Sequence, residues 1–459
     1  MTRAIVLAGG RGKKIWPYDE ARNKVATPVM NVPNVRRLVD SLVSAGISQI
    51  AVAVGHQEGS VRSALEGSEA KIAFYRPGQE GGTNGAVLSG WPLVASETIA
   101  VAYGDVCCPP EAMRQALAAF ASSGAIAGAV VCKLGPNDDP RDWIGAVVSN
   151  GEIGKIEGHS TDNDHRLAGL YFLTPQAIAH LEANPGRMES VPIGGMPPSE
   201  PELAQSIQLL IEKGEHVQAI ETQGFWIDLD KPWHILEANR KWLEHEAASL
   251  AQNPIADGAQ IDDSAEIDGF VSLGKNARIG KRAVIKGPLF LGEGAQAING
   301  AIVNGACAVG RNSVLKDYCL IDAGTVIGSD CIVGHGAEMD GAMFDGAYLY
   351  HYCEISGVVG EKVDIGAATV CGTLRFDDGE TSHWVQGRRE TPPNFSNATY
   401  FGDYCRTGVN VITLPGRKIG AYSCVGPGVI VTEDVPNRTL LTVKQELVQK
   451  EWGPEKYGW

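Results

Sequence analysis

Two hydrophobic periods divide the chain, and the second one is highly regular. From Ile255 to Met339 every sixth residue is hydrophobic. Because only 44% of all residues are hydrophobic, such a run would arise by chance on the order of once in 10^5 sequences. A period of six is typical of a parallel β-helix with three short strands in each coil. The positions are Ile255, Ile261, Ile267, Leu273, Ile279, Ile285, Leu291, Ala297, Val303, Val309, Leu315, Ile321, Ile327, Val333 and Met339.

The six-residue pattern is interrupted twice before it ends. It weakens near residues 345–352 and stops across residues 375–400, then returns at Phe401-Gly402. The second interruption is polar and contains Pro392-Pro393, which predicts an excursion loop rather than a coil. Small residues four places after many of the hydrophobic ones predict tight corners, and glycine often follows a hydrophobic position directly, which accounts for much of the excess in 56 glycines.

The first half alternates strand and helix patterns. Short apolar runs predict strands at 4–7, 49–55, 99–103 and 125–132, and helical spacing predicts helices at 35–45 and 111–122. Strands that alternate with helices are typical of a parallel sheet covered on both faces. Ligands in such folds lie beyond the carboxyl ends of the strands, where Gly9-Gly10 and Asp105 are found.

These patterns predict four parts. An α/β, Rossmann-like domain spans residues 1–231, and a helical connector spans 232–252. The β-helix follows at 253–435, with its excursion loop at 375–400, and a C-terminal arm occupies 436–459.

Composition narrows the function classes. The net charge of −15 argues against a protein that grips nucleic acid or an anionic membrane surface, because both need a basic face. No apolar run is long enough to span a bilayer, and the start lacks the apolar segment of a signal peptide. The ten cysteines are dispersed without metal-binding spacing. We therefore expect reduced thiols and a cytoplasmic protein.

The glycine loop after the first strand predicts phosphate binding. Residues 7–17 read LAGGRGKKIWP, and glycines let backbone amides approach a phosphate closely. Lys13 and Lys14 can neutralise a triphosphate. Farther on come Asn23-Lys24, Gly82-Thr83, Gly104-Asp105 and Trp226-Ile227-Asp228.

In this order, the motifs resemble those of sugar-1-phosphate nucleotidylyltransferases, over roughly residues 3–240. The resemblance implies attack of a sugar phosphate on the α-phosphorus of a nucleoside triphosphate, with release of pyrophosphate. It implies Lys14 and Lys24 as catalytic residues, and Mg2+ held by Asp105 and Asp228, although Asp230 is close enough to compete. The remaining residues that it implies are Leu7, Ala8, Gly9, Gly10, Gly82, Thr83 and Gly104 for the nucleotide, and Gly145, Glu157 and Gly169 for the sugar phosphate.

The sequence departs from that family pattern mainly in the acceptor half. Lys14 stands where the family has arginine, and Asn23 stands where it has proline. The family's Glu-Lys-Pro motif falls on Glu157-Gly158-His159, so the lysine for the acceptor phosphate is absent, and Leu167 replaces an asparagine. Lys155 and His159 are candidate substitutes.

The second half resembles left-handed β-helix acyltransferases, particularly the C-terminal half of bifunctional sugar-phosphate uridylyltransferase/N-acetyltransferases. The matching stretch runs from His351 through Val359-Gly360 to Asp377, and continues at residues 407–420. The resemblance implies His351 as the base that deprotonates an acceptor amine. It also implies acetyl-CoA bound between coils of adjacent subunits, and a homotrimer.

Three hypotheses remain open from sequence. The first is a nucleotidyltransferase that forms an NDP-sugar or NDP-cyclitol. The second is an acetyltransferase whose first half only positions a nucleotide-linked acceptor. The third is a catalytically weak or silent regulatory subunit that binds nucleotide sugars. Lys24, Asp105 and Asp228 favour the first, whereas the absent lysine at Gly158 favours the other two.

Overall fold

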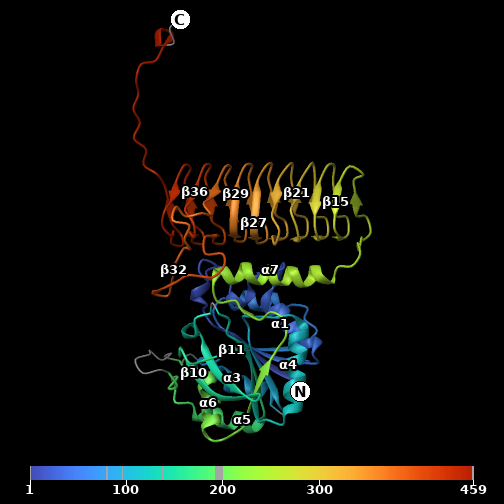
Figure 1. Ribbon diagram of the computed structural model, residues 1–459, viewed down its shortest axis with the longest axis vertical. Helices are drawn as coiled ribbons and strands as arrows, with labels where there is room; N and C mark the ends of the chain where they lie inside the picture. The colour runs from blue at the N-terminus through green and yellow to red at the C-terminus, as the bar shows by residue number, and fades with distance from the viewer. Residues whose placement is uncertain (1, 79–80, 96, 137, 192–199, 457–459) are drawn as a thin grey trace.

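The chain forms two bodies with helix α7 (Pro232–Ser249) lying between them (Figure 1). The computed structural model describes residues 2–456 except 79–80, 96, 137 and 192–199. The N-terminal body is an α/β unit, and the C-terminal body is a stack of short parallel strands. Among the described residues, no helix is both long and apolar enough to cross a membrane.

A nine-stranded mixed sheet forms the centre of the N-terminal body. The strand order is β5-β4-β1-β6-β11-β8-β12-β10-β9, in which β5, β4, β1 and β6 are mutually parallel. Strand β11 runs antiparallel to β6 and β8, which corrects the expected parallel sheet. The reason is that β9, β10 and β11 follow one another without a helical crossover, and short links join antiparallel strands. The strands are β1 (Arg3–Ala8), β4 (Gln49–Val54), β5 (Lys71–Tyr75), β6 (Ile99–Tyr103), β8 (Ala127–Lys133), β9 (Ile144–Ser149), β10 (Glu152–Gly158), β11 (His165–Leu173) and β12 (Val217–Glu221).

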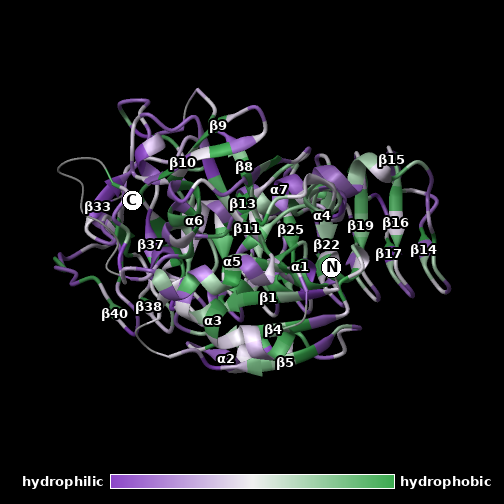
Figure 2. Cartoon of the chain, turned by 90° about the horizontal axis from the view of Figure 1, so that it is seen from below, coloured by the Kyte–Doolittle hydropathy of each residue, from purple (hydrophilic) through white to green (hydrophobic). Residues whose placement is uncertain are grey.

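Helices cover both faces of this sheet. Leu38 of α1 and Met113 of α4 pack in one apolar cluster, and Val87 of α3 and Ile207 of α6 pack in another. Figure 2 shows the hydrophobic residues gathered along the central strands, including β1 and β4. The predicted strands and helices of this half coincide with observed elements. The helices are α1 (Asn34–Ser44), α2 (Glu58–Ala64), α3 (Gly82–Val94), α4 (Pro110–Ser123), α5 (Pro175–His180) and α6 (Leu203–Glu212). The short 3-10 turns are η1 (Lys13–Ile15), η2 (Lys24–Ala26), η3 (Pro140–Asp142) and η4 (Leu181–Ala183). Two small strand pairs are formed by β2 (Pro28–Val29) with β3 (Val32–Pro33), and by β7 (Val106–Cys107) with β13 (Ile227–Asp228).

The C-terminal body is a parallel β-helix, as the six-residue period predicts. Ile261 pairs with Ile279, and Ile279 pairs with Ala297, so each coil takes 18 residues, or three hexapeptides. From Leu273 to Met339 the hexad residues are buried and fill the interior, with buried small residues such as Ala277 and Cys319 beside them. At the first coil Ile255 and Ile261 are exposed. The coil strands are β14 (Gln260–Ile261), β15 (Glu266–Asp268), β16 (Val271–Leu273), β17 (Arg278–Ile279), β18 (Val284–Lys286), β19 (Leu289–Leu291), β20 (Gln296–Ala297), β21 (Ile302–Val303), β22 (Cys307–Val309), β23 (Val314–Leu315), β24 (Leu320–Ile321), β25 (Val326–Ile327), β26 (Ile332–Val333), β27 (Glu338–Met343), β28 (Tyr348–Leu349), β29 (Glu354–Val359), β30 (Asp364–Ile365), β31 (Val370–Cys371), β34 (Thr399–Phe401), β35 (Arg406–Thr407), β36 (Ile412–Thr413), β37 (Lys418–Ile419), β38 (Cys424–Val425), β39 (Ile430–Val431) and β40 (Leu440–Leu441).

Both interruptions of the pattern have structural counterparts. Near residue 345 the coil shortens, because Ile332 pairs with Tyr348 only 16 residues later. The excursion loop contains a hairpin made of β32 (His383–Val385) and β33 (Arg388–Glu390). The coils continue to β40, past the predicted end at residue 435. After β40 the chain leaves the body (Figure 1) and includes one 3-10 turn, η5 (Pro454–Lys456).

The two bodies are packed together through apolar and charged contacts. Tyr18 of the first body lies in one buried cluster with Trp233 of α7 and Tyr400 of the β-helix. The guanidinium of Arg22 is buried and lies 2.8 Å from Glu361 and 2.9 Å from Asp403. The N-terminal body is therefore fixed against the β-helix by direct contacts.

Candidate active site

The loop after β1 is shaped by glycines that cannot carry side chains. A Cβ on Gly55 would lie 2.5 Å from the carbonyl oxygen of Gly9. Gly12 has a φ of +64°, and a Cβ there would lie 2.9 Å from the side chain of Lys24. The loop therefore runs close to Lys24, with Leu7 and Ala8 at the end of β1 before it. This places the predicted phosphate loop beside a cation.

Four charged side chains converge beside this loop, at the carboxyl ends of the central strands. The Nζ atom of Lys24 lies 2.5 Å from Asp105 Oδ2 and 3.4 Å from Asp230 Oδ1. The Nζ atom of Lys14 lies 3.2 Å from Asp230 Oδ2. Burial disfavours the charge of Lys24, but Asp105 and Asp230 outweigh it and raise the pKa of this ammonium. Lys24 is therefore held as a cation in the centre of the cluster.

Asp228 joins the cluster from β13, which pairs with β7 just after Asp105. Its Oδ2 atom lies 3.1 Å from the guanidinium of Arg166, and its buried Oδ1 atom has no hydrogen-bond partner among the residues that the structure describes. Burial raises the pKa of Asp228 to about 6; Arg166 opposes this shift, and the nearby Asp105 and Asp230 add to it.

These carboxylates fit a divalent metal ion in one respect. The unpaired Oδ1 of Asp228 is a hard oxygen ligand of the kind that Mg2+ takes, usually with one or two carboxylates and substrate phosphates. Within the described part of the chain, no group of three or more His, Cys, Asp and Glu side chains is arranged to hold a metal.

Asn23 is a structural determinant of the site that sequence reasoning missed. Its side chain is fully buried, and its Nδ2 atom lies 3.2 Å from the Ala8 oxygen, 3.0 Å from the Gly10 oxygen and 2.7 Å from the His56 oxygen. Its Oδ1 accepts a hydrogen bond from the Val25 amide and caps η2, which begins with Lys24. The only signal in the sequence was an asparagine where the family has proline.

The residues around Gly82 connect the loop before α3 to α6. Gly82 has a φ of +49°, and a Cβ there would collide with the backbone of Pro201. Thr83 donates a hydrogen bond of 2.9 Å to Glu202 and accepts one from the Leu203 amide. Gly104 donates its amide hydrogen to the Leu7 oxygen, which ties the β6 end to the phosphate loop.

The predicted acceptor residues lie on three neighbouring strands. Gly145 of β9 pairs directly with Glu157 of β10. Gly169 of β11 has a φ of +69°, and a Cβ there would contact Val106 and Tyr103, which flank the Asp105 turn. The structure therefore brings Gly145 and Glu157 together, and places Gly169 beside the cluster of charges.

Both candidate substitutes for the missing lysine already have partners, and the partner of Lys155 is itself a predicted acceptor residue. The Nζ atom of Lys155 lies 2.9 Å from Glu157. His159 has a φ of +59°, and its Nδ1 atom lies 2.7 Å from the carbonyl oxygen of Arg141. Arg166 is a partly buried cation that lies 3.1 Å from Asp228, and sequence reasoning did not single it out.

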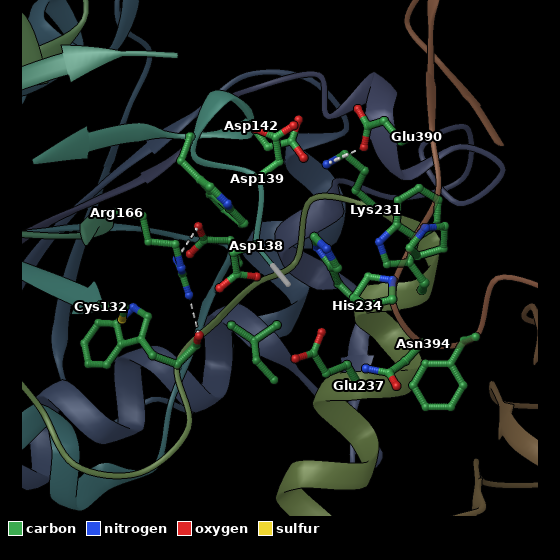
Figure 3. A pocket seen from close by; sticks show the side chains of 18 of the residues that line it. Cys132, Asp138, Asp139, Asp142, Arg166, Lys231, His234, Glu237, Glu390 and Asn394 are labelled. Carbon is green, nitrogen blue, oxygen red and sulfur yellow. Dashed lines mark hydrogen bonds and ion pairs between the residues drawn. The ribbon is translucent and has the colours of Figure 1, made fainter. Parts of the chain in front are cut away.

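A cavity of about 690 Å³ opens where the two bodies meet (Figure 3). Asp228 and Arg166 line it from the first body, and Lys231, His234 and Glu237 line it from the start of α7. Strand β33 and the residues that follow it, 388–395 in all, line the cavity from the excursion loop. No sequence signal showed that the excursion loop turns back toward the first body.

His351, the predicted base of the second half, lies on the β-helix and not at this cavity. It is exposed in the turn after β28, and its ring packs edge to face on Tyr352 at 5.4 Å. Tyr352 in turn contacts His335 at 5.3 Å. The structure thus places His351 in an exposed aromatic row on the coil surface.

Comparisons with known proteins find relatives that match nearly the whole chain. A bifunctional sugar-1-phosphate nucleotidylyltransferase/acetyltransferase from Sulfurisphaera tokodaii is 28% identical over 94% of this chain and 98% of its own length. The bifunctional protein GlmU of Methanococcus maripaludis is 25% identical over 97% of this chain and 98% of its own length. A UDP-glucose pyrophosphorylase solved with UDP-glucose is 17% identical, and it covers 53% of this chain and 99% of its own with a TM-score of 0.46.

The family profile described as nucleotidyl transferase matches residues 3–245, which is just over half of the chain. That range contains the phosphate loop, Lys14, Lys24, Asp105 and Asp228. The chain belongs to the nucleotidyl transferase family.

Proposed function

We propose that the N-terminal body transfers a nucleotidyl group from a nucleoside triphosphate to a sugar-1-phosphate or a similar phosphorylated polyol. The observation that carries this proposal is the convergence of Lys14, Lys24, Asp105 and Asp228 beside a glycine loop. The names of the full-length relatives, which pair nucleotidyl transfer with acetyl transfer, support it.

The arrangement suits a reaction between two anions. An oxygen of the acceptor phosphate attacks the α-phosphorus, the new P–O bond forms, and the bond to the β-phosphate oxygen breaks to release pyrophosphate. Lys14 and Lys24 offset the negative charge that develops on the transferred group, which is the main electrostatic demand of phosphoryl chemistry. Asp105 and Asp228 would hold Mg2+, which supplies further charge neutralisation when it is bound.

A pyrophosphate-release screen tests this function. It would combine UTP, dTTP, GTP, ATP and CTP, each with Mg2+, with a panel of sugar phosphates and polyol phosphates. We expect release for at least one pair and none after Asp105→Ala. A silent regulatory subunit would instead bind nucleotide sugars without releasing pyrophosphate from any pair.

The β-helix supports a second proposed activity, acyl transfer from acetyl-CoA with His351 as the base. The exposed position of His351 on the coil surface leaves its ring accessible to an amine acceptor. The matched assay follows acetyl-CoA-dependent thiol release with amino-sugar phosphates, for the wild type and for His351→Ala. Activity that survives in His351→Ala would remove this residue from the mechanism.

We also propose that the chain forms a homotrimer through the β-helix. Apolar side chains on the outer coil surface, such as Ile412 and Ile430, are exposed and would be buried by closed cyclic symmetry. Light scattering on the full chain would give a mass of three times 48.7 kDa. A mass near that of one chain at micromolar concentration would reject the trimer and a shared acetyl-CoA groove.

A further inference from the structure

The hairpin β32–β33 reaches from the β-helix into the charge network of the candidate active site. Glu390 Oε2 lies 2.9 Å from the Nζ atom of Lys231, and both side chains are about nine-tenths buried (Figure 3). Arg388 holds Glu390 from the other side at 2.7 Å, and also lies 3.3 Å from Asp142 of the first body. The hairpin is therefore anchored both to Lys231 and to Asp142 of the first body.

Lys231 stands at the N-terminus of α7, where a buried ammonium needs a carboxylate partner. It is the residue before α7, so its charge adds to the positive end of the helix dipole. Its Nζ atom lies 2.9 Å from Glu390 but 3.9 Å from Asp230 Oδ2. Glu390 is thus the nearer of its two carboxylates, and it comes from the other body.

Asp230 Oδ2 is the atom for which two lysines compete. Lys14 already lies 3.2 Å from this oxygen, and its side chain is 48% exposed. The exposed side chain of Lys14 is less constrained than the buried side chain of Lys231. If Lys231 lost Glu390, its ammonium would remain buried and would move to Asp230, because an unpaired buried charge is strongly unfavourable.

We propose that Glu390 is a positioning residue for nucleotidyl transfer, because it holds Lys231 away from Asp230 and so leaves Asp230 to orient Lys14. This inference rests on the proposed function of the N-terminal body. It means that the β-helix contributes to the chemistry of the first body through one carboxylate. Glu390 itself does not contact the reacting groups; it acts through Lys231 and Asp230.

A set of variants separates this role from simple packing. Glu390→Gln keeps the shape and removes the charge, and we expect kcat for pyrophosphate release to fall about tenfold and the KM for the nucleotide to rise. Lys14→Ala should be costly in the wild type but nearly neutral in Glu390→Gln, because Lys14 has already lost its partner. Adding Lys231→Met to Glu390→Gln removes the competing ammonium and should restore most of kcat.

The matched control is Asp377→Asn, which breaks an exposed ion pair with Arg375 in the same excursion loop. We expect wild-type kinetics for it. Circular dichroism melting of every variant checks that each is folded at the assay temperature. A purely structural role predicts equal losses from Lys14→Ala in both backgrounds and no rescue by Lys231→Met, and either result would overturn the proposal.

The test also distinguishes failure of the inference from failure of the proposed function. If the wild type releases no pyrophosphate from any pair, the function fails, and calorimetric titration of UTP into the same variants decides the inference. Affinity should then fall in Glu390→Gln and recover in the double variant. Unchanged affinity in Glu390→Gln, or no UTP binding by the wild type, would overturn it.

Discussion

Lys24 is the side chain around which the charges of the active site are arranged. It contacts Asp105 and Asp230 at once, and its own position depends on the Asn23 cap and on the absence of a side chain at Gly12. Asn23 and Gly12 therefore act in two ways: they fix the glycine loop, and they hold the Lys24 ammonium at the candidate active site.

Lys24→Met should lower kcat/KM for pyrophosphate release by at least about 100-fold, the range expected when one preorganised charge partner is lost from a transition state. Asp105 and Asp230 would then face each other without the cation that separates them. Steady-state kinetics with saturating Mg2+ measure the loss. Lys71→Ala, an exposed change on β5, is the control, and a loss under fivefold for Lys24→Met would contradict this role.

Asn23→Ala should destabilise the N-terminal body by about 2–4 kcal/mol. The substitution removes the donor that three backbone carbonyl oxygens share, and of the three bonds only the one to the Ala8 oxygen is buried. One buried acceptor left unsatisfied costs about 1–3 kcal/mol, and the lost cap of η2 adds about 1 kcal/mol. Urea unfolding followed by tryptophan fluorescence measures the free energy of unfolding. Asn31→Ala, which removes a single hydrogen bond to the Ile327 oxygen, should cost clearly less.

At the scale of elements, β37 shows how a coil strand is fixed by the other body. Lys418 of β37 is almost fully buried, and its Nζ atom lies 5.8 Å from the ring centres of both Trp16 and Trp233. Its ammonium donates to the Trp384 oxygen at 3.4 Å. A coil residue thus packs against the η1 region and α7 together. Burial lowers the pKa of Lys418 to about 8, with Asp434 opposing this shift.

This lowered pKa gives a pH dependence with a definite sign. Between pH 8 and the ordinary lysine value of 10.5 the unfolded chain binds more protons than the folded one, so stability rises with pH across that window. Below pH 8 the full penalty, about 3 kcal/mol, is present. Lys418→Met should therefore raise the free energy of unfolding at pH 7. Near pH 10 the variant and the wild type should differ less in this free energy. Equal stabilisation at both pH values would show that packing, not charge, is responsible.

At the scale of the whole molecule, the interface between the two bodies has an ionic contact at its centre. Arg22 connects the first body to Glu361 and to Asp403, whose side chain is fully buried. A buried pair of this kind adds little net stability over an apolar replacement, but removal of one partner leaves a buried charge.

Arg22→Met should therefore cost about 3–5 kcal/mol and loosen the contact between the bodies. We expect limited proteolysis to cut near residues 250–255, after α7, faster than in the wild type. Arg36→Met removes an exposed pair with Asp40 on α1 and serves as the control. If Arg22→Met and Arg36→Met were cut at the same rate, the ionic contact would not be what holds the bodies together.

Much of the candidate site could be predicted from the sequence, but the contacts that its residues make with distant segments could not. The glycine loop and Asp105 follow strand ends, and the carboxyl ends of adjacent strands meet at one edge of a sheet. The family resemblance added Lys24 and Asp228. The roles of Asn23 and Arg166 did not follow from these signals, because each depends on contacts with segments far away in the chain. The mixed sheet was missed because an alternating pattern does not reveal the direction of β11.

The sequence by itself determined the repeated elements and the motif residues, whereas the tertiary structure decided how the two bodies share one site. A six-residue period reflects the local geometry of a coil, so it is visible in the sequence of the β-helix without knowledge of distant contacts. The pairing of Lys231 with Glu390 brings together residues that are far apart along the chain, and it depends on how the excursion loop folds across α7. Contacts of this kind depend on the packing of whole bodies, and local patterns carry no information about them.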